Sequence, residues 1–155
     1  MTFDEAFTRL VGHEGGYVDD PHDAGGETKF GVSKRTYPNV DIKALTLEQA
    51  KGLYKRDYWD RAQCDQLPPA IAFQVFDTAV NSGIEQAIRF LQRAVGMADD
   101  GLVGPLTIGA VKRMDTEAVI ARFNGQRLMF MTKLSSWDFF GRGWARRIAA
   151  NLMEA

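Results

Sequence analysis

Apolar residues recur every three or four positions along most of the chain, which is the spacing of amphipathic α-helices. Thr2 and Glu5 have the spacing of a capping box, so a first helix should begin beside them. Gly15 and Gly16 should end it, because paired glycines readily leave the helical conformation. The apolar face of this helix consists of Phe3, Phe7, Leu10 and Val11.

Capping residues, prolines and glycines mark the ends of the later helices. Thr46 and Gln49 form a second capping box, Pro68–Pro69 precedes a strongly apolar helix, and Ser82 with Glu85 is expected to cap the helix after it. We expect these helices over about 46–59, 69–82, 83–95, 105–114 and 117–134, and a last one that follows a glycine-rich turn at 137–144 and ends at Leu152.

The segment 17–32 differs from the rest, because it is rich in Gly, Asp and Pro and carries no helical pattern. It is typical of an ordered loop or a short hairpin. No sustained alternation of apolar and polar residues is present elsewhere. The predicted fold class is therefore mainly α, with at most a small β-hairpin near residues 17–32.

Composition excludes several classes of protein. At 155 residues, with 45% apolar and 25% charged residues, the chain fits one globular domain, or two small ones that share a core. A net charge of -1 gives no general attraction to nucleic acid, although seven cationic residues between Arg113 and Arg147 form either a solvated face or an anion patch. No apolar run is long enough for a membrane span, so we expect no membrane insertion.

Cysteine and histidine give no sign of a metal or a cofactor. Cys64 is the only cysteine, which excludes an internal disulfide and a cysteine-based zinc site. His13 and His22 do not have metal-ligand spacing with it. The start of the sequence lacks the basic and apolar regions of a signal peptide. We therefore expect synthesis in the cytoplasm, with no metal and no cofactor.

Glu14 is the first candidate for chemistry. It lies seven residues after Phe7 and four after Leu10, so it continues the apolar face of the first helix. Burial and the negative end of the helix dipole both disfavour a charged carboxylate and raise its pKa. A general acid that works near neutral pH needs such a shift. The alternative is a structural role, as a cap or as the partner of an arginine.

A second carboxylate is available in the loop that follows. Asp23 comes nine residues after Glu14, beyond Pro21, and Thr28 adds a hydroxyl able to hold a water or a sugar oxygen. Glycoside hydrolysis needs an acid on the leaving oxygen and a second carboxylate across the sugar. Glu14 and Asp23 supply such a pair, while Asp19, Asp20 and Glu27 compete for the role of Asp23.

The ordered set of residues in this segment resembles glycoside hydrolase family 108, a family of N-acetylmuramidases. The resemblance includes Glu14-Gly15-Gly16-Tyr17, Asp23-x-Gly25-Gly26-x-Thr28, Gly31, Tyr58-Trp59 and Phe76-Asp77-x-x-Val80-Asn81-x-Gly83. It implies a lysozyme-like fold and hydrolysis of the β-1,4 bond between N-acetylmuramic acid and N-acetylglucosamine. It also implies that Glu14 is the catalytic acid and that Asp23 and Thr28 act from the opposite side.

Further residues of this segment are candidates for substrate binding, each with a structural alternative. Aromatic rings such as Tyr17 and Tyr58 either stack on sugars or belong to the core. Asn81 either hydrogen-bonds an N-acetyl group or ends its helix. The predicted substrate-binding residues are Tyr17, Asp19, Gly26, Tyr58 and Asn81.

The second half resembles the repeat of small helical peptidoglycan-binding domains. The matching residues are Leu91-Gln92-x-x-Val95-Gly96 and Asp100-Gly101-x-x-Gly104-Pro105-x-Thr107-x-x-Ala110-Val111. We therefore divide the chain into a muramidase region at 1–86 and a peptidoglycan-binding-like region at 87–155, packed into one body. Residues 87–155 either bind the wall or form the second lobe of a single lysozyme-like body.

The resemblance also implies partners and a setting. We expect a monomer that acts on peptidoglycan glycan strands in the periplasm, as a phage or prophage endolysin released by a holin or another release factor. A secretion-associated muramidase is the alternative setting. Two rival functions remain open, which are a lytic transglycosylase that needs one carboxylate and a non-catalytic wall-binding module in which Glu14 is structural.

Overall fold

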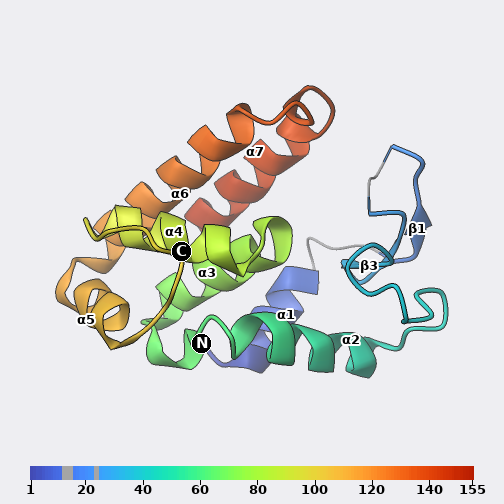
Figure 1. Ribbon diagram of the computed structural model, residues 1–155, viewed down its shortest axis with the longest axis horizontal. Coiled ribbons are helices and arrows are strands. Elements are labelled where there is room, and N and C mark those ends of the chain that lie inside the picture. The colour runs from blue at the N-terminus through green and yellow to red at the C-terminus, as the bar shows by residue number, and fades with distance from the viewer. Residues whose placement is uncertain (12–15, 23–24) are drawn as a thin grey trace.

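The computed structural model describes residues 1–11, 16–22 and 25–155, and it is mainly α-helical (Figure 1). This confirms the predicted fold class. Within these residues, no helix is both long and apolar enough to span a membrane. The elements in chain order are α1 (Phe3–Val11), β1 (Val18–Asp19), β2 (Glu27–Lys29), β3 (Val32–Ser33), α2 (Leu47–Tyr54), the π-helical turn η1 (Lys55–Trp59), the 3₁₀ turn η2 (Cys64–Gln66), α3 (Pro69–Ser82), α4 (Ile84–Ala94), α5 (Pro105–Arg113), α6 (Thr116–Thr132) and α7 (Trp137–Met153).

Helix α3 is the centre of the structure. All nine residues from Ile71 to Ala79 are buried, and a helix that is covered on every side must have neighbours all round it. The helices α1, α4 and α6 and the turn η1 pack against it. Helices α6 and α7 form an antiparallel pair on one side, and the small sheet lies beyond them at one end of the molecule (Figure 1).

The two predicted capping boxes are confirmed. The backbone amide of Thr2 donates to Glu5 Oε2 at 2.8 Å, and the backbone amide of Glu5 donates to Thr2 Oγ1 at 3.3 Å. Thr46 and Gln49 exchange the equivalent pair of bonds at the start of α2. Each box satisfies two backbone groups that a helix leaves unpaired at its N-terminus.

The predicted cap of α4 by Ser82 and Glu85 is wrong. Only Gly83, with φ of +93°, separates α3 from α4, and α4 begins without a side-chain cap. Ser82 is still the last residue of α3, so it cannot take the extended conformation that an N-cap needs. Glu85 pairs instead with Arg89 one turn along α4, at 2.9 Å.

The glycine-rich loop forms a three-stranded antiparallel sheet, which extends one residue beyond the predicted hairpin region. Val18 pairs with Thr28, and Thr28 pairs with Ser33. Phe30 and Gly31 connect β2 to β3 with φ of +52° and +78°, as a two-residue hairpin turn requires. The hydroxyl of Tyr54 donates to the carbonyl of Phe30 and so attaches this turn to the end of α2.

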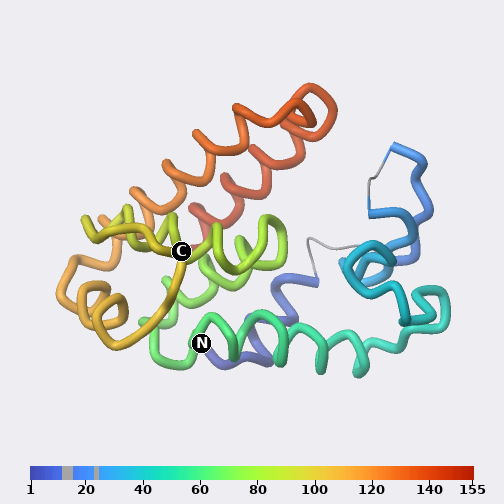
Figure 2. The backbone as a smooth tube through the Cα atoms, viewed as in Figure 1, coloured from blue at the N-terminus to red at the C-terminus, as the bar shows by residue number. Residues whose placement is uncertain are grey.

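One apolar core extends through both halves of the chain. Phe3, Trp59 and Phe76 form its aromatic centre, with ring centroids 5.4–5.8 Å apart. The same cluster of buried residues continues through α4 to Phe123 of α6. The backbone path is drawn in Figure 2. The C-terminal end of the chain returns to the first helix, because Arg9 of α1 forms a 2.6 Å ion pair with Glu154, next to the C-terminal residue.

The predicted glycine-rich turn at 137–144 is wrong, since this segment is the first half of α7. Aromatic packing within the helix explains the glycine at position 141. The Trp137 ring lies over Gly141 and contacts Trp144, with a ring-centroid distance of 6.1 Å. A Cβ at Gly141 would lie 2.5 Å from the Trp137 ring, so only glycine lets this ring lie flat on the helix.

The two glycines of α7 should respond in opposite directions to alanine. Gly143→Ala should stabilise the protein by about 0.5–1 kcal/mol, because a Cβ there meets nothing within 4 Å and alanine favours the helix. Gly141→Ala should destabilise it, by about 1–3 kcal/mol, because the Trp137 ring must move. Urea unfolding of both variants measures the difference. A stabilising Gly141→Ala would show that the ring does not depend on this glycine.

Candidate active site

A cleft of about 780 Å³ lies between the sheet and the helices. The sheet and the turn at 33–37 form one wall, and the ends of α2, η1 and α3 form the other. Most polar groups on its lining are hydroxyls and amides. Arg35 is the one charged residue among the described residues that line it. Such a surface suits a neutral, hydroxyl-rich ligand such as a sugar chain.

One face of the sheet borders this cleft. Cross-strand pairing aligns Val18, Thr28 and Ser33 across the three strands, and all three line the cleft. Thr28 belongs to the middle strand and is half-buried. The structure therefore presents the predicted Thr28 at the wall of a large cleft.

The carboxylates that competed with Asp23 either alternate with Thr28 along the strands or accept hydrogen bonds from other groups. In the sheet, Asp19 lies opposite Glu27, one position along the strands from Thr28. Because successive residues of a strand point to opposite faces, these two side chains point away from the face that carries Thr28. Glu27 accepts a 2.7 Å hydrogen bond from the Tyr17 hydroxyl, which raises the pKa of Tyr17 to about 12. Asp20 accepts from the backbone amide of His22 at 2.9 Å, and this bond lowers the pKa of Asp20.

Two tyrosines line the cleft from opposite walls, Tyr37 from the turn after β3 and Tyr58 from η1. The Tyr37 hydroxyl donates to Asp57 Oδ2 at 2.7 Å, and burial together with this bond raises the pKa of Tyr37. Arg56 pairs with both oxygens of Asp57 at 2.7 and 2.8 Å, which lowers the pKa of that carboxyl. Tyr58 follows directly in η1, is half-buried, and has its pKa raised by burial. Both hydroxyls are thus protonated at neutral pH, and the bond to Asp57 holds the Tyr37 hydroxyl in place.

The cleft brings together three of the predicted site residues, which are Thr28 from β2, Tyr58 from η1 and Asn81 from α3. Tyr17, Asp19 and Gly26 lie on or beside the sheet and are not among the described residues that line the cleft. Gly26 has φ of +73° in the turn before β2, which explains the glycine there. Glu14 and Asp23 lie outside the described residues.

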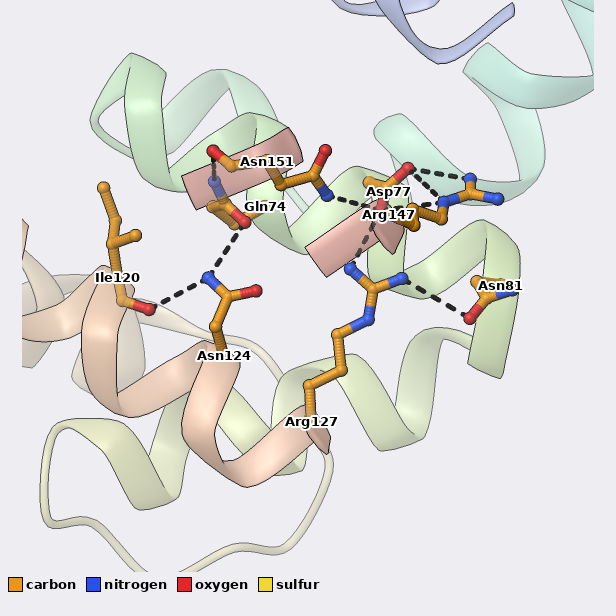
Figure 3. A network of polar contacts seen from close by, with 8 residues as sticks. All are labelled: Gln74, Asp77, Asn81, Ile120, Asn124, Arg127, Arg147 and Asn151. Atoms are coloured by element: carbon orange, nitrogen blue, oxygen red, sulfur yellow. Dashed lines mark hydrogen bonds and ion pairs between the residues drawn. The ribbon is translucent and has the colours of Figure 1, made fainter. Parts of the chain in front are cut away.

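A buried ionic network stands behind the cleft wall (Figure 3). Asp77 of α3 accepts from Arg127 of α6 at 2.9 Å, from Arg147 of α7 at 2.7 Å, and from Asn151 at 2.8 Å. Asp77, Arg127 and Asn151 are fully buried. Burial alone would raise the pKa of Asp77, but the two guanidinium charges and their hydrogen bonds lower it to about 2. Asp77 is therefore ionised at neutral pH.

The described residues contain no group of histidine, cysteine and acidic side chains that could hold a metal ion. Cys64 is free and buried, and burial raises the pKa of its thiol. A buried thiol of this kind is a core residue and not a nucleophile.

Comparisons with known proteins agree with this geometry. Residues 7–83 match the family model described as Glycosyl hydrolase 108. The solved structure titled "Structure of Brucella abortus SagA" is 32% identical, superimposes with a TM-score of 0.93, and aligns over 98% of this chain and 92% of that one. The chain belongs to the glycosyl hydrolase 108 family. It is thus a glycoside hydrolase of a lysozyme-like, peptidoglycan-hydrolysing family. No curated protein matches the sequence.

The part of the chain that matches the family model includes Thr28, Tyr58 and Asn81, but several residues around the cleft were not predicted. Arg35 and Tyr37 lie in a polar turn without periodicity, which gave no signal. Asp77 and Arg127 did carry a signal. Asp77 interrupts an apolar helix, and Arg127 follows Phe123 by one turn on an apolar face, and a buried charge of either sign needs a partner.

The ionic network makes stability depend on acid pH. The folded-state pKa of Asp77 is lowered from its ordinary 3.8 to about 2. Its ionisation therefore contributes fully to the free energy of unfolding above about pH 4, and this contribution is lost as the pH falls toward 2. Asp77→Asn leaves two guanidinium groups without a charged partner and should cost about 3–5 kcal/mol at pH 7.

Urea unfolding of wild type and Asp77→Asn between pH 7 and pH 2 tests this prediction. The difference in free energy of unfolding between the two proteins should be constant down to about pH 4 and then shrink by about 2 kcal/mol. A difference that does not change with pH would show that folding does not lower the pKa of Asp77.

Proposed function

We propose that this glycosyl hydrolase is an N-acetylmuramidase, which hydrolyses the β-1,4 bond between N-acetylmuramic acid and N-acetylglucosamine in peptidoglycan. The observation that carries the proposal is the meeting of Thr28, Tyr58 and Asn81 in one large, hydroxyl-lined cleft. These residues come from three separate elements, and the resemblance to muramidases had selected each of them from sequence alone.

In this mechanism Glu14 donates a proton to the glycosidic oxygen as the bond to the anomeric carbon breaks. The aglycone then leaves as a neutral alcohol, and positive charge develops on the sugar ring. A second carboxylate across the ring, for which we propose Asp23, stabilises this charge, attacks the anomeric carbon or activates water. Thr28 holds the water or a sugar oxygen. The roles of Glu14 and Asp23 rest on the sequence.

The engagement of the other acidic residues supports Asp23 for that role. Asp19 and Glu27 lie on positions that alternate with Thr28 along the strands, Glu27 accepts from Tyr17, and Asp20 accepts from His22. A carboxylate that already serves another bond is a poorer partner for a developing cation across the cleft.

The biological setting remains a prediction. We propose an endolysin of a phage or prophage that acts as a monomer on the wall after a hole-forming partner releases it, with a secretion-associated muramidase as the alternative. Wall binding by residues 87–155 is likewise a prediction.

Replacing the proton donor should abolish activity without unfolding the protein. Glu14→Gln keeps the size and polarity of the side chain but cannot donate a proton as an acid, so general acid catalysis worth roughly 10²–10⁴-fold is lost. Loss of turbidity of purified bacterial walls measures activity, while circular dichroism and thermal melting check the fold. A folded and fully active Glu14→Gln protein would contradict the proposed mechanism.

Two further isosteric substitutions identify the second carboxylate. Asp23→Asn should reduce turbidity loss by at least roughly tenfold, because charge stabilisation across the sugar is removed. The matched control is Glu27→Gln, which keeps a hydrogen-bond acceptor for Tyr17 and should retain activity. The reverse result would assign the role to Glu27, and full activity of both variants would favour the lytic transglycosylase.

A further inference from the structure

Asn81 is held from behind by a residue that belongs to the other half of the chain. Arg127 Nη2 donates to Asn81 Oδ1 at 3.4 Å, while Nη1 of the same guanidinium donates to Asp77 Oδ2 at 2.9 Å (Figure 3). Asp77 and Asn81 are one helical turn apart on α3, so the planar guanidinium spans the two side chains.

The direction of the Asn81 amide follows from this contact. Arginine only donates hydrogen bonds, so the amide must turn its oxygen toward Arg127. Asn81 also lines the cleft, and among the described residues its amide nitrogen has no acceptor. The group that Asn81 offers to the cleft is therefore an N–H donor and not a carbonyl oxygen.

We propose that Arg127 is a positioning residue that locks the amide of Asn81, so that the cleft presents a hydrogen-bond donor to the carbonyl oxygen of an N-acetyl group on the glycan. This inference rests on the proposed function, because it takes the glycan as the ligand of the cleft. It goes beyond the proposed function by giving a role to Arg127, which lies outside the segment that matches the family model. It also predicts that the enzyme prefers N-acetylated over N-deacetylated sugars.

The ionic network makes this lock rigid. Arg127 is fully buried, and Asp77, which is ionised and itself held by Arg147 and Asn151, fixes its guanidinium. A free asparagine amide can rotate and offer either group. An N-deacetylated sugar carries an ammonium group, which only donates and would meet the donor of Asn81 unfavourably.

A double-mutant cycle on soluble, uncross-linked glycan strands tests whether Arg127 acts through Asn81. Arg127→Lys keeps the charge beside Asp77, but one ammonium group is not a planar fork that spans both partners. Arg127→Lys and Asn81→Ala should each lower kcat/KM roughly five- to tenfold, mainly through KM. In the Asn81→Ala background, Arg127→Lys should lower it by less than about twofold.

The matched control is Asn124→Ala, which removes a buried 3.1 Å hydrogen bond from α6 to Gln74 of α3 but no bond of Asp77, Arg127 or Asn81. It should lower the melting temperature while leaving KM of the folded protein unchanged. Asn81→Asp is a second variant, and it should fold normally because a carboxylate strengthens the pair with Arg127. It removes the N–H donor, since a carboxylate only accepts hydrogen bonds. It should melt no lower than wild type and still lose roughly tenfold in kcat/KM.

Substrate chemistry gives an independent readout. Wild type should cleave chemically N-deacetylated strands roughly tenfold less well than N-acetylated ones, and re-acetylation should restore cleavage. This ratio should shrink in Asn81→Ala and in Arg127→Lys. Equal effects of Arg127→Lys in both backgrounds, or an unchanged ratio, would overturn the inference. Activity that survives Glu14→Gln would instead overturn the proposed function, so the two failures are distinguishable.

Discussion

A carboxylate in the middle of an apolar helix constrains this fold more than any other group. Transfer of an unpaired Asp77 into the core would cost far more than the few kcal/mol by which a domain of this size is stable. The protein meets that cost with two guanidinium groups and an amide, which come from α6 and α7. The C-terminal helices must therefore pack against α3 before the core is stable.

The position of the cleft follows from this packing. Helix α3 carries Asp77 inside the core and Asn81 at the cleft wall, one turn further on. The segment that matches the family model ends at residue 83, yet the partners of α3 lie beyond it. The cleft wall thus depends on residues 87–155, whatever those residues bind. On the opposite wall, the hairpin turn at Phe30 is attached to α2 through Tyr54.

The sequence predicted those features that depend on neighbouring residues. The capping boxes at Thr2 and Thr46 and the end of α3 at Gly83 involve bonds within a few positions, and all are confirmed. The Ser82 cap and the turn at 137–144 were wrong because a one-residue link and a tryptophan ring over Gly141 overrode local preference. Thr28, Tyr58 and Asn81 were found through the resemblance, whereas Arg35 and Tyr37 reach the cleft only through the tertiary fold.

If the protein is an N-acetylmuramidase, as we propose, it hydrolyses the bond on the reducing side of N-acetylmuramic acid. Mass analysis of the products from purified walls, before and after borohydride reduction, tests it most directly. We expect fragments that end in a reducible N-acetylmuramic acid, so that borohydride converts every new end. Products that end in an anhydro sugar, or in a reducible N-acetylglucosamine, would contradict it.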